Sequence, residues 1–331
     1  MSVRAGAPIL EVRDLHVWFD LDDGGKLHAV QDVSFDLSLG ERFGLVGESG
    51  CGKTTTILAL MGLLPPSATV SGQVRLMGKD ILAGGEDTIR SHRWSDIAMV
   101  FQGAMNALNP VKRVGAQIVE PIELHGIAEG EEAKQSARAL LEMVGIPGQA
   151  ADRYPHEFSG GMRQRAAIAM ALACRPKILL ADEPTTALDV MVQAQILELL
   201  VRLADELGLA LILVTHDLPV VAQVCERAAV MYAGEIVESG SLDELFHTPR
   251  HPYTRLLFAS TPDLFGDEVI ASIPGAPPRL DREIEGCPFR LRCDRAFDRC
   301  VVEHPKLKEV AFGHAAACHL NDLPAEAGAR T

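Results

Sequence analysis

The chain has 331 residues and a formal net charge of −14, so it is long enough for about two domains and lacks the basic balance typical of nucleic-acid-binding proteins. No stretch approaches about 18 consecutive apolar residues, which argues against a membrane-spanning helix. The first residues carry one cation, Arg4, and no apolar run, so we expect no signal peptide and a cytoplasmic protein.

The beginning of the chain predicts strands. Two runs, 9–19 and 29–39, alternate apolar and polar residues as half-buried strands do, and turn-forming residues lie between them at 22–25. A short apolar run at 42–46 predicts a third strand, and residues 55–64 predict a helix.

Strands and helices then alternate. Apolar runs predict strands at 96–101, 178–181, 211–214 and 228–232. Helical patterns lie between them, most clearly at 162–173 and 190–207. This alternation indicates an α/β fold with a mostly parallel sheet and crossover helices.

Two regions depart from this alternation. Residues 103–155 are helix-like, with 131–144 the clearest case, so we expect a helical subdomain inserted into the α/β core. A shift to Pro, Arg and Cys near Pro249 marks a second module. The predicted domains are therefore 1–248 and 249–331.

A glycine-rich segment joins the third strand to the following helix. It reads G-x-x-x-x-G-K-T, the pattern of a phosphate-binding loop in the strand–loop–helix context that this motif requires. Lys53 would reach the β- and γ-phosphates of ATP, and the Thr54 hydroxyl would ligate Mg²⁺. The other residues expected around the nucleotide are Gly47, Ser49, Gly50, Cys51, Gly52 and Thr55. We expect Cys51 to be a tolerated small residue and not a redox switch.

An apolar strand at 178–181 is followed by two acids, Asp182 and Glu183. Carboxylates at the carboxyl end of a parallel strand lie beside a phosphate-binding loop. We therefore expect Asp182 to hold Mg²⁺ through water and Glu183 to act as the general base that activates the attacking water. The alternative is an acidic turn that caps the next helix.

A third motif, Phe158-Ser159-Gly160-Gly161-Met162-Arg163-Gln164-Arg165, opens the helix at 162–173. Placed between the loop and the acidic strand, it resembles the signature sequence of ABC-type ATPases. Gln102 resembles the glutamine of that family's Q-loop, Asp189 closes a segment similar to its D-loop, and His216 lies in a segment similar to its switch histidine. These motifs occur in the family's order over residues 10 to about 240.

The resemblance implies how these residues work. One subunit places ATP among Lys53, Thr54 and the catalytic group Glu183, His216 and Gln102, with Mg²⁺ held by Thr54, Gln102 and Asp182. The signature of a partner subunit, Ser159, Gly160 and Gly161, closes over the γ-phosphate. Phe19 falls where the family stacks an aromatic ring on adenine, and Trp18 is the alternative.

The C-terminal tail indicates which subfamily of ABC-type ATPases the chain resembles. The segment around His251-Pro252-Tyr253-Thr254 is similar to the tails of dipeptide and oligopeptide importer ATPases, and closest to the first of their two ATPase subunits. Four cysteines, Cys287, Cys293, Cys300 and Cys318, are separated by 5, 6 and 17 residues. Such a set suits a thiolate metal site, and the resemblance implies a [4Fe–4S] cluster. Zinc and free thiols remain alternatives, and His319 is a spare ligand candidate.

The resemblance also implies partners: two transmembrane permease subunits, a second ABC ATPase subunit that forms a heterodimer, and an extracytoplasmic peptide-binding protein. The chain would lie on the cytoplasmic face of the cell membrane as a peripheral protein. The stretch 105–121 would contact the permeases. Two other readings stay open: the same role with nickel or an oligosaccharide as cargo, and a soluble ABC ATPase acting on nucleic acid or ribosomes.

Overall fold

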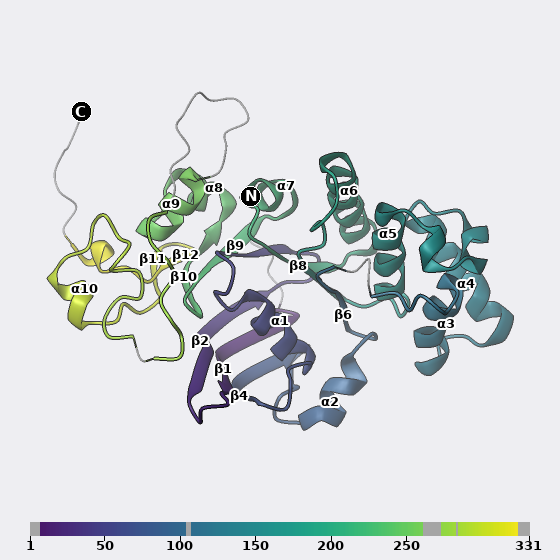
Figure 1. The fold of residues 1–331 in the computed structure, drawn as a ribbon, viewed down its shortest axis with the longest axis horizontal. Coiled ribbons are helices and arrows are strands. Elements are labelled where there is room, and N and C mark those ends of the chain that lie inside the picture. The colour runs from purple at the N-terminus through teal and green to yellow at the C-terminus, as the bar shows by residue number, and fades with distance from the viewer. Residues whose placement is uncertain (1–6, 104–106, 261–272, 283, 324–331) are drawn as a thin grey trace.

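A computed structural model describes residues 7–103, 107–260, 273–282 and 284–323. The described chain forms two sheets with helices around them (Figure 1). None of the helices in this part of the chain combines the length and apolar character needed to span a bilayer.

The larger sheet has eight strands in the order β11-β12-β10-β9-β3-β8-β7-β6. Its central pairs, from β9 to β6, are parallel, which confirms the predicted α/β arrangement. These strands are short apolar runs because both faces of this part of the sheet are buried, one mainly by helices and the other mainly by a second sheet. The strands of this parallel part are β3 (Arg42–Val46), β6 (Ile97–Val100), β7 (Ile178–Asp182), β8 (Ala210–Thr215) and β9 (Arg227–Tyr232).

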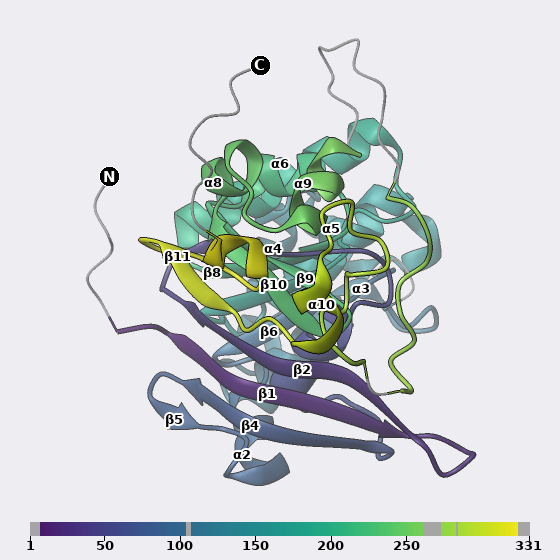
Figure 2. The same ribbon diagram turned by 90° about the vertical axis from the view of Figure 1, so that its left-hand side faces the viewer.

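The first two predicted strands belong to a separate antiparallel sheet, so the expectation of a single, mostly parallel sheet was incomplete. The order is β2-β1-β4-β5, and its strands are β1 (Leu10–Asp20), β2 (Lys26–Leu37), β4 (Ala68–Leu76) and β5 (Lys79–Asp80). Figure 2 shows this sheet lying below the larger one. Its alternating pattern arises because one face packs on the core and the other meets water. A shared apolar cluster fills the space between the two sheets.

The helices follow the predicted periodicity. Helix α6 (Val190–Leu207) has the predicted bounds, and α4 (Gly130–Met143) is shifted by one residue. The range 103–155 contains α3 (Val114–Leu124), α4 and a 3₁₀ turn, η2 (Gly148–Asp152). These helices lie with α5 (Gly160–Ala171) at one end of the molecule (Figure 1). The remaining helical elements are α1 (Lys53–Met61), α2 (Gly85–His92), η3 (Pro155–Glu157) and α7 (Leu218–Val224).

The tail packs on the α/β core. Strand β12 (His314–Ala316) pairs with β10 (Glu235–Ser241) and so extends the larger sheet. Tyr253, Cys287 and Phe289 are buried in the same apolar cluster as the sheet. The predicted second module therefore shares a core with the first. Helix α8 (Leu242–His247) precedes the predicted boundary at 248. The other elements of the tail are α9 (Pro252–Ala259), α10 (Asp298–Val302), β11 (Lys308–Ala311) and η4 (His319–Asp322).

Candidate nucleotide-binding site

The glycine-rich loop connects the end of β3 to the start of α1. Gly50 and Gly52 have φ angles of 80° and 104°, in the region that favours glycine. A Cβ atom on Gly52 would lie 2.6 Å from the carbonyl oxygen of Ala29, and one on Gly47 would lie 2.2 Å from that of Met231. The loop can therefore follow this path only with glycine at these positions.

Lys53 is buried inside the loop. Its Nζ donates hydrogen bonds to the carbonyl oxygens of Gly47 at 2.7 Å and Glu48 at 3.0 Å. Cys51 lies beside it, and burial raises the pKa of the Cys51 thiol. A raised pKa keeps this cysteine in the unreactive thiol form.

Asp182 ends β7 opposite the loop. Its carboxylate accepts a hydrogen bond from Thr54 Oγ1 at 3.1 Å, and its residue is only 1% exposed. Burial raises the pKa of Asp182 to about 6, although the Thr54 hydrogen bond opposes this shift. Thr54 and Asp182 thus offer two oxygen ligands side by side, a donor set that suits Mg²⁺.

Three side chains donate hydrogen bonds to the carboxylate of Glu183. His216 Nδ1 donates to Glu183 Oε1 at 2.8 Å, and Gln102 and Thr186 donate to Oε2 at 2.9 and 3.0 Å. Burial acts to raise the pKa of Glu183, but the hydrogen bonds from His216 and Thr186 outweigh it and lower the pKa. Glu183 has a φ of 43°, a conformation uncommon outside glycine, which occurs often at functional sites.

Lys53, Thr54, Gln102 and Glu183 line one pocket of about 370 Å³. Asp182 and His216 contact these residues but do not line the pocket, and neither do Gly47 and Cys51. The pocket walls come from the antiparallel sheet, from the loop and the start of α1, from the residues that follow β6 and β7, and from the tail, whose Leu280 was not expected from the sequence. Phe19 lines the pocket, whereas Trp18 stacks on His28 with ring centroids 4.5 Å apart and does not line it. The lining residues are Phe19, Leu27, Ala29, Ser49, Gly50, Gly52, Lys53, Thr54, Thr55, Gln102, Glu183 and Leu280.

The signature residues are not part of this pocket. Ser159 caps α5 by accepting a hydrogen bond from the Met162 amide at 3.3 Å, and Gly160 and Gly161 form the first turn. Asp189 caps α6 in the same way. The fold leaves the amino end of α5 separate from the chain's own phosphate-binding loop.

The four tail cysteines line one small cavity of about 10 Å³, together with His251 and His319. Burial raises the pKa of Cys287 to about 12 and that of Cys318 to about 11. His319 Nε2 donates to the carbonyl oxygen of Glu303 at 2.9 Å, so this nitrogen of the spare ligand candidate is already engaged. Across the described residues, no group of three or more His, Cys, Asp or Glu side chains is arranged to hold a metal ion. The metal centre therefore stays a prediction.

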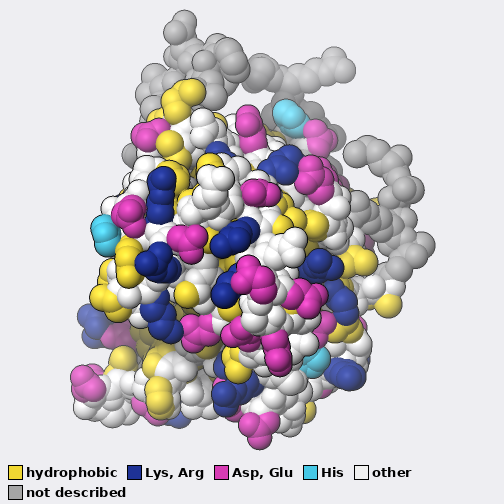
Figure 3. All heavy atoms as spheres, turned by 90° about the vertical axis from the view of Figure 1, so that its right-hand side faces the viewer, with side chains coloured by type: hydrophobic (Ala, Val, Ile, Leu, Met, Phe, Trp, Pro, Cys, Tyr) yellow, Lys and Arg dark blue, Asp and Glu magenta, His cyan; other side chains and the backbone are white. Residues whose placement is uncertain are grey.

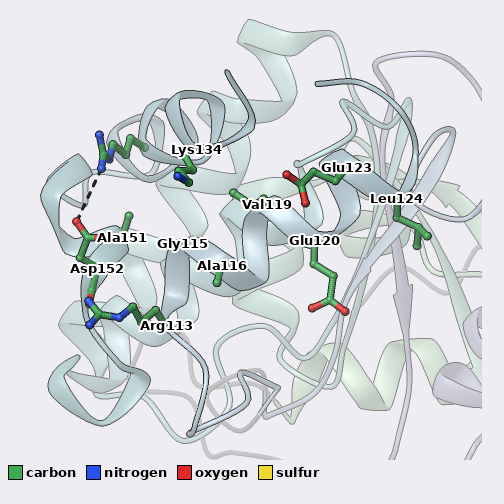
Figure 4. Close-up of a pocket in the computed structure, with 11 residues that line it drawn as sticks. Arg113, Gly115, Ala116, Val119, Glu120, Glu123, Leu124, Lys134, Ala151 and Asp152 are labelled. Atoms are coloured by element: carbon green, nitrogen blue, oxygen red, sulfur yellow. Dashed lines mark hydrogen bonds and ion pairs between the residues drawn. The ribbon is translucent and has the colours of Figure 1, made fainter. Parts of the chain in front are cut away.

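A groove of about 690 Å³ lies in the helical part, between α3, α4 and η2 (Figure 4). Gly115, Ala116, Val119 and Ala151 give it apolar lining. Charged side chains surround them, and Figure 3 shows acids and bases interspersed on this end of the molecule. The charged lining residues are Arg113, Glu120, Glu123, Lys134, Arg138 and Asp152. Five lining residues fall within the predicted contact stretch 105–121, although residues 105 and 106 lie outside the described part.

Residues 30–186 match the family described as ABC transporter, and residues 237–300 match the oligopeptide/dipeptide transporter C-terminal region. The chain is 48% identical over 316 residues to the probable peptide ABC transporter ATP-binding protein y4tR of Sinorhizobium fredii, covering 94% of both chains. It is 47% identical over 324 residues to the dipeptide transport ATP-binding protein DppD of Bacillus subtilis, covering 96% of both.

The same similarity extends to structures. The dimeric ATP-binding cassette MJ0796 in a post-hydrolysis state bound to ADP and Pi has a TM-score of 0.63 and 30% identity, over 70% of this chain and 98% of that one. CbiO1 of Clostridium perfringens, part of a CbiONQ transporter complex, has a TM-score of 0.62 over 73% of this chain and 92% of its own. The chain belongs to the ABC transporter ATPases, in the branch that carries the oligopeptide/dipeptide transporter C-terminal region.

Proposed function

We propose that this chain hydrolyses ATP to power the import of dipeptides or oligopeptides through a membrane permease complex. The observation that carries the proposal is the pocket in which Lys53, Thr54 and Glu183 meet, on a chain whose relatives are named as peptide transport ATP-binding proteins. Nickel or oligosaccharide cargo is the alternative, since the binding protein and permeases, and not this chain, would choose the cargo.

Each group in and beside the pocket would have its own task. Lys53 would exchange the carbonyl oxygens of Gly47 and Glu48 for the phosphate oxygens of ATP. Glu183, with its lowered pKa, stays ionised near neutral pH and would accept the proton of the attacking water. His216 holds that carboxylate in place and would sense the γ-phosphate.

The residues present fit Mg²⁺. Thr54 and Asp182 supply adjacent oxygens, and Gln102 donates to Glu183 through Nε2, which leaves its Oε1 for the metal. When bound, Mg²⁺ neutralises charge that develops on the phosphate oxygens. Asp182 must lose its proton to take part.

The site would be completed by a second ATPase subunit. Ser159, Gly160 and Gly161 lie outside this chain's own pocket, where the free amides at the start of α5 can face an anion on another chain. We propose a heterodimer in which each signature closes over the other subunit's ATP. Asp189, at the start of α6, would lie at the same interface.

The groove between α3, α4 and η2 would receive the cytoplasmic segments of two permease subunits. Its apolar floor and mixed charges suit a short amphipathic helix. The chain would thus sit on the cytoplasmic face of the membrane as a peripheral subunit, with a peptide-binding protein on the other side.

The tail cysteines would hold a [4Fe–4S] cluster. Four thiols from separate parts of the tail surround one cavity, and a thiolate set of this kind is the usual ligand set for such clusters. The thiolates of a cluster bind four different irons, so they stand further apart than the ligands of a single zinc ion. When bound, the cluster would supply covalent cross-links between Cys287, Cys293, Cys300 and Cys318.

Uptake by the reassembled complex tests this function. The tagged chain is purified from its own cells with the membrane subunits and second ATPase that accompany it, and the complex is placed in liposomes with ATP inside. We expect ATP-dependent uptake of a labelled dipeptide or tripeptide when the binding protein is added, and none with Glu183→Gln. Uptake of nickel or an oligosaccharide, with no uptake of peptide, would show that the cargo is not a peptide. If RNA or ribosomes stimulated ATP hydrolysis and no membrane partner were found, the chain would be an ATPase that acts on RNA or ribosomes and not a transport subunit.

A further inference from the structure

We infer that Arg292 and Tyr253, both in the C-terminal extension, are positioning residues that hold the phosphate-binding loop in its nucleotide-binding form. The inference rests on the proposed use of residues 47–54 as the phosphate site. It adds two residues from outside the ATPase motifs to the machinery of ATP binding, through their contacts with Glu48.

The first contact is a two-pronged ion pair. Arg292 Nη1 donates to Glu48 Oε2 at 2.6 Å, and Nη2 donates to Oε1 at 2.9 Å. The Arg292 side chain is 5% exposed and that of Glu48 is 25% exposed. A bidentate pair shielded from water is stronger and more directional than a surface pair.

Arg292 is itself fixed on other sides. Its Nε donates to the carbonyl oxygen of Pro274 at 2.8 Å, and Nη1 also donates to the Tyr232 hydroxyl at 3.3 Å. Its guanidinium lies 5.7 and 6.0 Å from the ring centroids of Tyr232 and Phe289. An arginine guanidinium is always charged in proteins, so these contacts hold a fixed positive charge beside Glu48.

The second contact is on the backbone of the same residue. The Glu48 amide donates to the hydroxyl oxygen of Tyr253 at 2.9 Å, and Tyr253 is fully buried. Tyr253 and Arg292 of the extension thus hold the backbone amide and the side chain of Glu48. The carbonyl oxygen of Glu48 in turn accepts the hydrogen bond of Lys53.

Charge gives the pair a second role. Glu48 is a carboxylate inside a loop that must surround a triphosphate, and an unpaired negative charge there would repel the ligand. Arg292 neutralises this charge. Without Arg292, the loop would lose one of its two anchors and its charge balance, while Glu183, Gln102 and His216 would keep their places.

Four variants of the full chain test the inference by titration with a fluorescent ATP analogue in the presence of Mg²⁺. We expect Arg292→Gln to weaken binding about tenfold, because breaking a shielded pair leaves its partner uncompensated. The double variant Glu48→Gln/Arg292→Gln should recover most of that loss. Tyr253→Phe, which removes only the acceptor of the Glu48 amide, should weaken binding about fivefold. Arg255→Gln, which breaks an exposed pair with Asp294 elsewhere in the extension, is the control and should bind normally.

The kinetic signature separates positioning from general damage. In the ATPase complex, Arg292→Gln should raise KM for ATP and leave kcat within about twofold, because the groups around Glu183 are untouched. If Arg292→Gln does not fold, Arg292→Lys and Tyr253→Phe replace it, with losses of the same sign. Normal binding by Arg292→Gln or Tyr253→Phe would overturn the inference, as would a double variant as weak as the single one. If the unaltered chain binds no nucleotide, the proposed function fails instead.

Discussion

The imidazole of His216 donates from Nδ1 to the carboxylate of Glu183 across 2.8 Å, joining the residue after β8 to the residue after β7. The two strands are parallel neighbours, so their carboxyl ends meet at one edge of the sheet. Gln102, after β6, reaches the same carboxylate from the next strand. Three consecutive strands of the sheet therefore converge on one carboxylate beside the phosphate-binding loop.

Replacement of Glu183 by Gln should preserve ATP binding and abolish turnover. The amide keeps the shape of the side chain but cannot accept the proton of water, and loss of a general base typically costs about 100- to 10,000-fold in rate. Release of phosphate by the transport complex measures turnover, and titration with a fluorescent ATP analogue measures binding. Glu226→Gln, on an exposed acid paired with Arg42, is the matched control and should leave both unchanged. Undiminished hydrolysis by Glu183→Gln would remove Glu183 from this role.

Binding of Mg²⁺ should weaken as the pH falls below about 6. Burial raises the pKa of Asp182 to about 6, so below this pH the carboxyl holds a proton that the metal must displace. The sign is that of an acid with a raised pKa: the neutral form dominates in the folded chain below about pH 6, and the ligand form dominates above it. The Mg²⁺ dependence of ATP-analogue binding from pH 5 to pH 8 measures the effect.

Two controls test whether Asp182 is the group that carries this proton. Binding of the analogue without Mg²⁺ should change much less over the same pH range. Asp182→Asn should bind Mg²⁺ weakly at every pH, with the midpoint near pH 6 gone. A midpoint that persists in Asp182→Asn would assign the proton to another group.

Replacement of Phe19 by Ala should weaken ATP binding about tenfold. Its ring lines the pocket, and stacking of a base on an aromatic side chain is worth about 1–3 kcal/mol. Trp18→Ala is the matched control, because the Trp18 ring stacks on His28 and does not line the pocket. Titration with ATP and with inorganic triphosphate separates the base from the phosphates, since Phe19→Ala should leave the second unchanged. Equal losses for both ligands would contradict a role for Phe19 in base binding.

Protein purified without oxygen should contain about four irons and four sulfides per chain if the tail cysteines hold a [4Fe–4S] cluster. Elemental analysis, sulfide determination and an absorption spectrum on one sample measure this. Cys293→Ser or Cys300→Ser should lose the metal, whereas Cys174→Ser, on a cysteine that donates to the Pro121 carbonyl in the helical part, should retain it. Stoichiometric zinc would make the tail a zinc module, and a metal-free protein would leave free thiols.

Charge reversal in the groove should reduce recruitment to membranes that contain the permeases. Glu120 and Lys134 line the groove, so Glu120→Lys or Lys134→Glu should disturb its charge pattern and release the chain into the soluble fraction. Sedimentation of membranes from cells that express the whole complex gives the readout, with ATP-analogue binding as a check on folding. Asp87→Lys, on the exposed part of α2, is the control. Full recruitment of both groove variants would exclude this surface as the permease contact.

Much of the site could be predicted because its chemistry is local in the sequence. Gly47, Gly52 and Lys53 form one short motif, and Asp182 and Glu183 end one apolar strand. Helix α6 could be predicted to its ends because Asp189 caps its beginning and Gly208, in a left-handed conformation, ends it.

Sequence patterns failed where distant residues had to be paired. The alternating runs at 9–19 and 29–39 predict strands but do not say which strands lie beside them, so the separate antiparallel sheet with β4 was not predicted. Leu280 reaches the pocket because the His28 amide donates to its carbonyl oxygen, and no local pattern marks that contact.

The sequence alone predicts the chemical groups of this protein: the pattern of a phosphate-binding loop, an acidic pair at the end of a strand, and a set of tail cysteines. Only the tertiary structure decided that Arg292 meets Glu48, 244 residues earlier in the chain, and that the extension shares the core of the ATPase. The difference comes from the separation along the sequence of the residues that interact. Local motifs depend on backbone conformation and side-chain type within a few residues, whereas the ion pair and the shared core depend on how the sheets and the tail pack together.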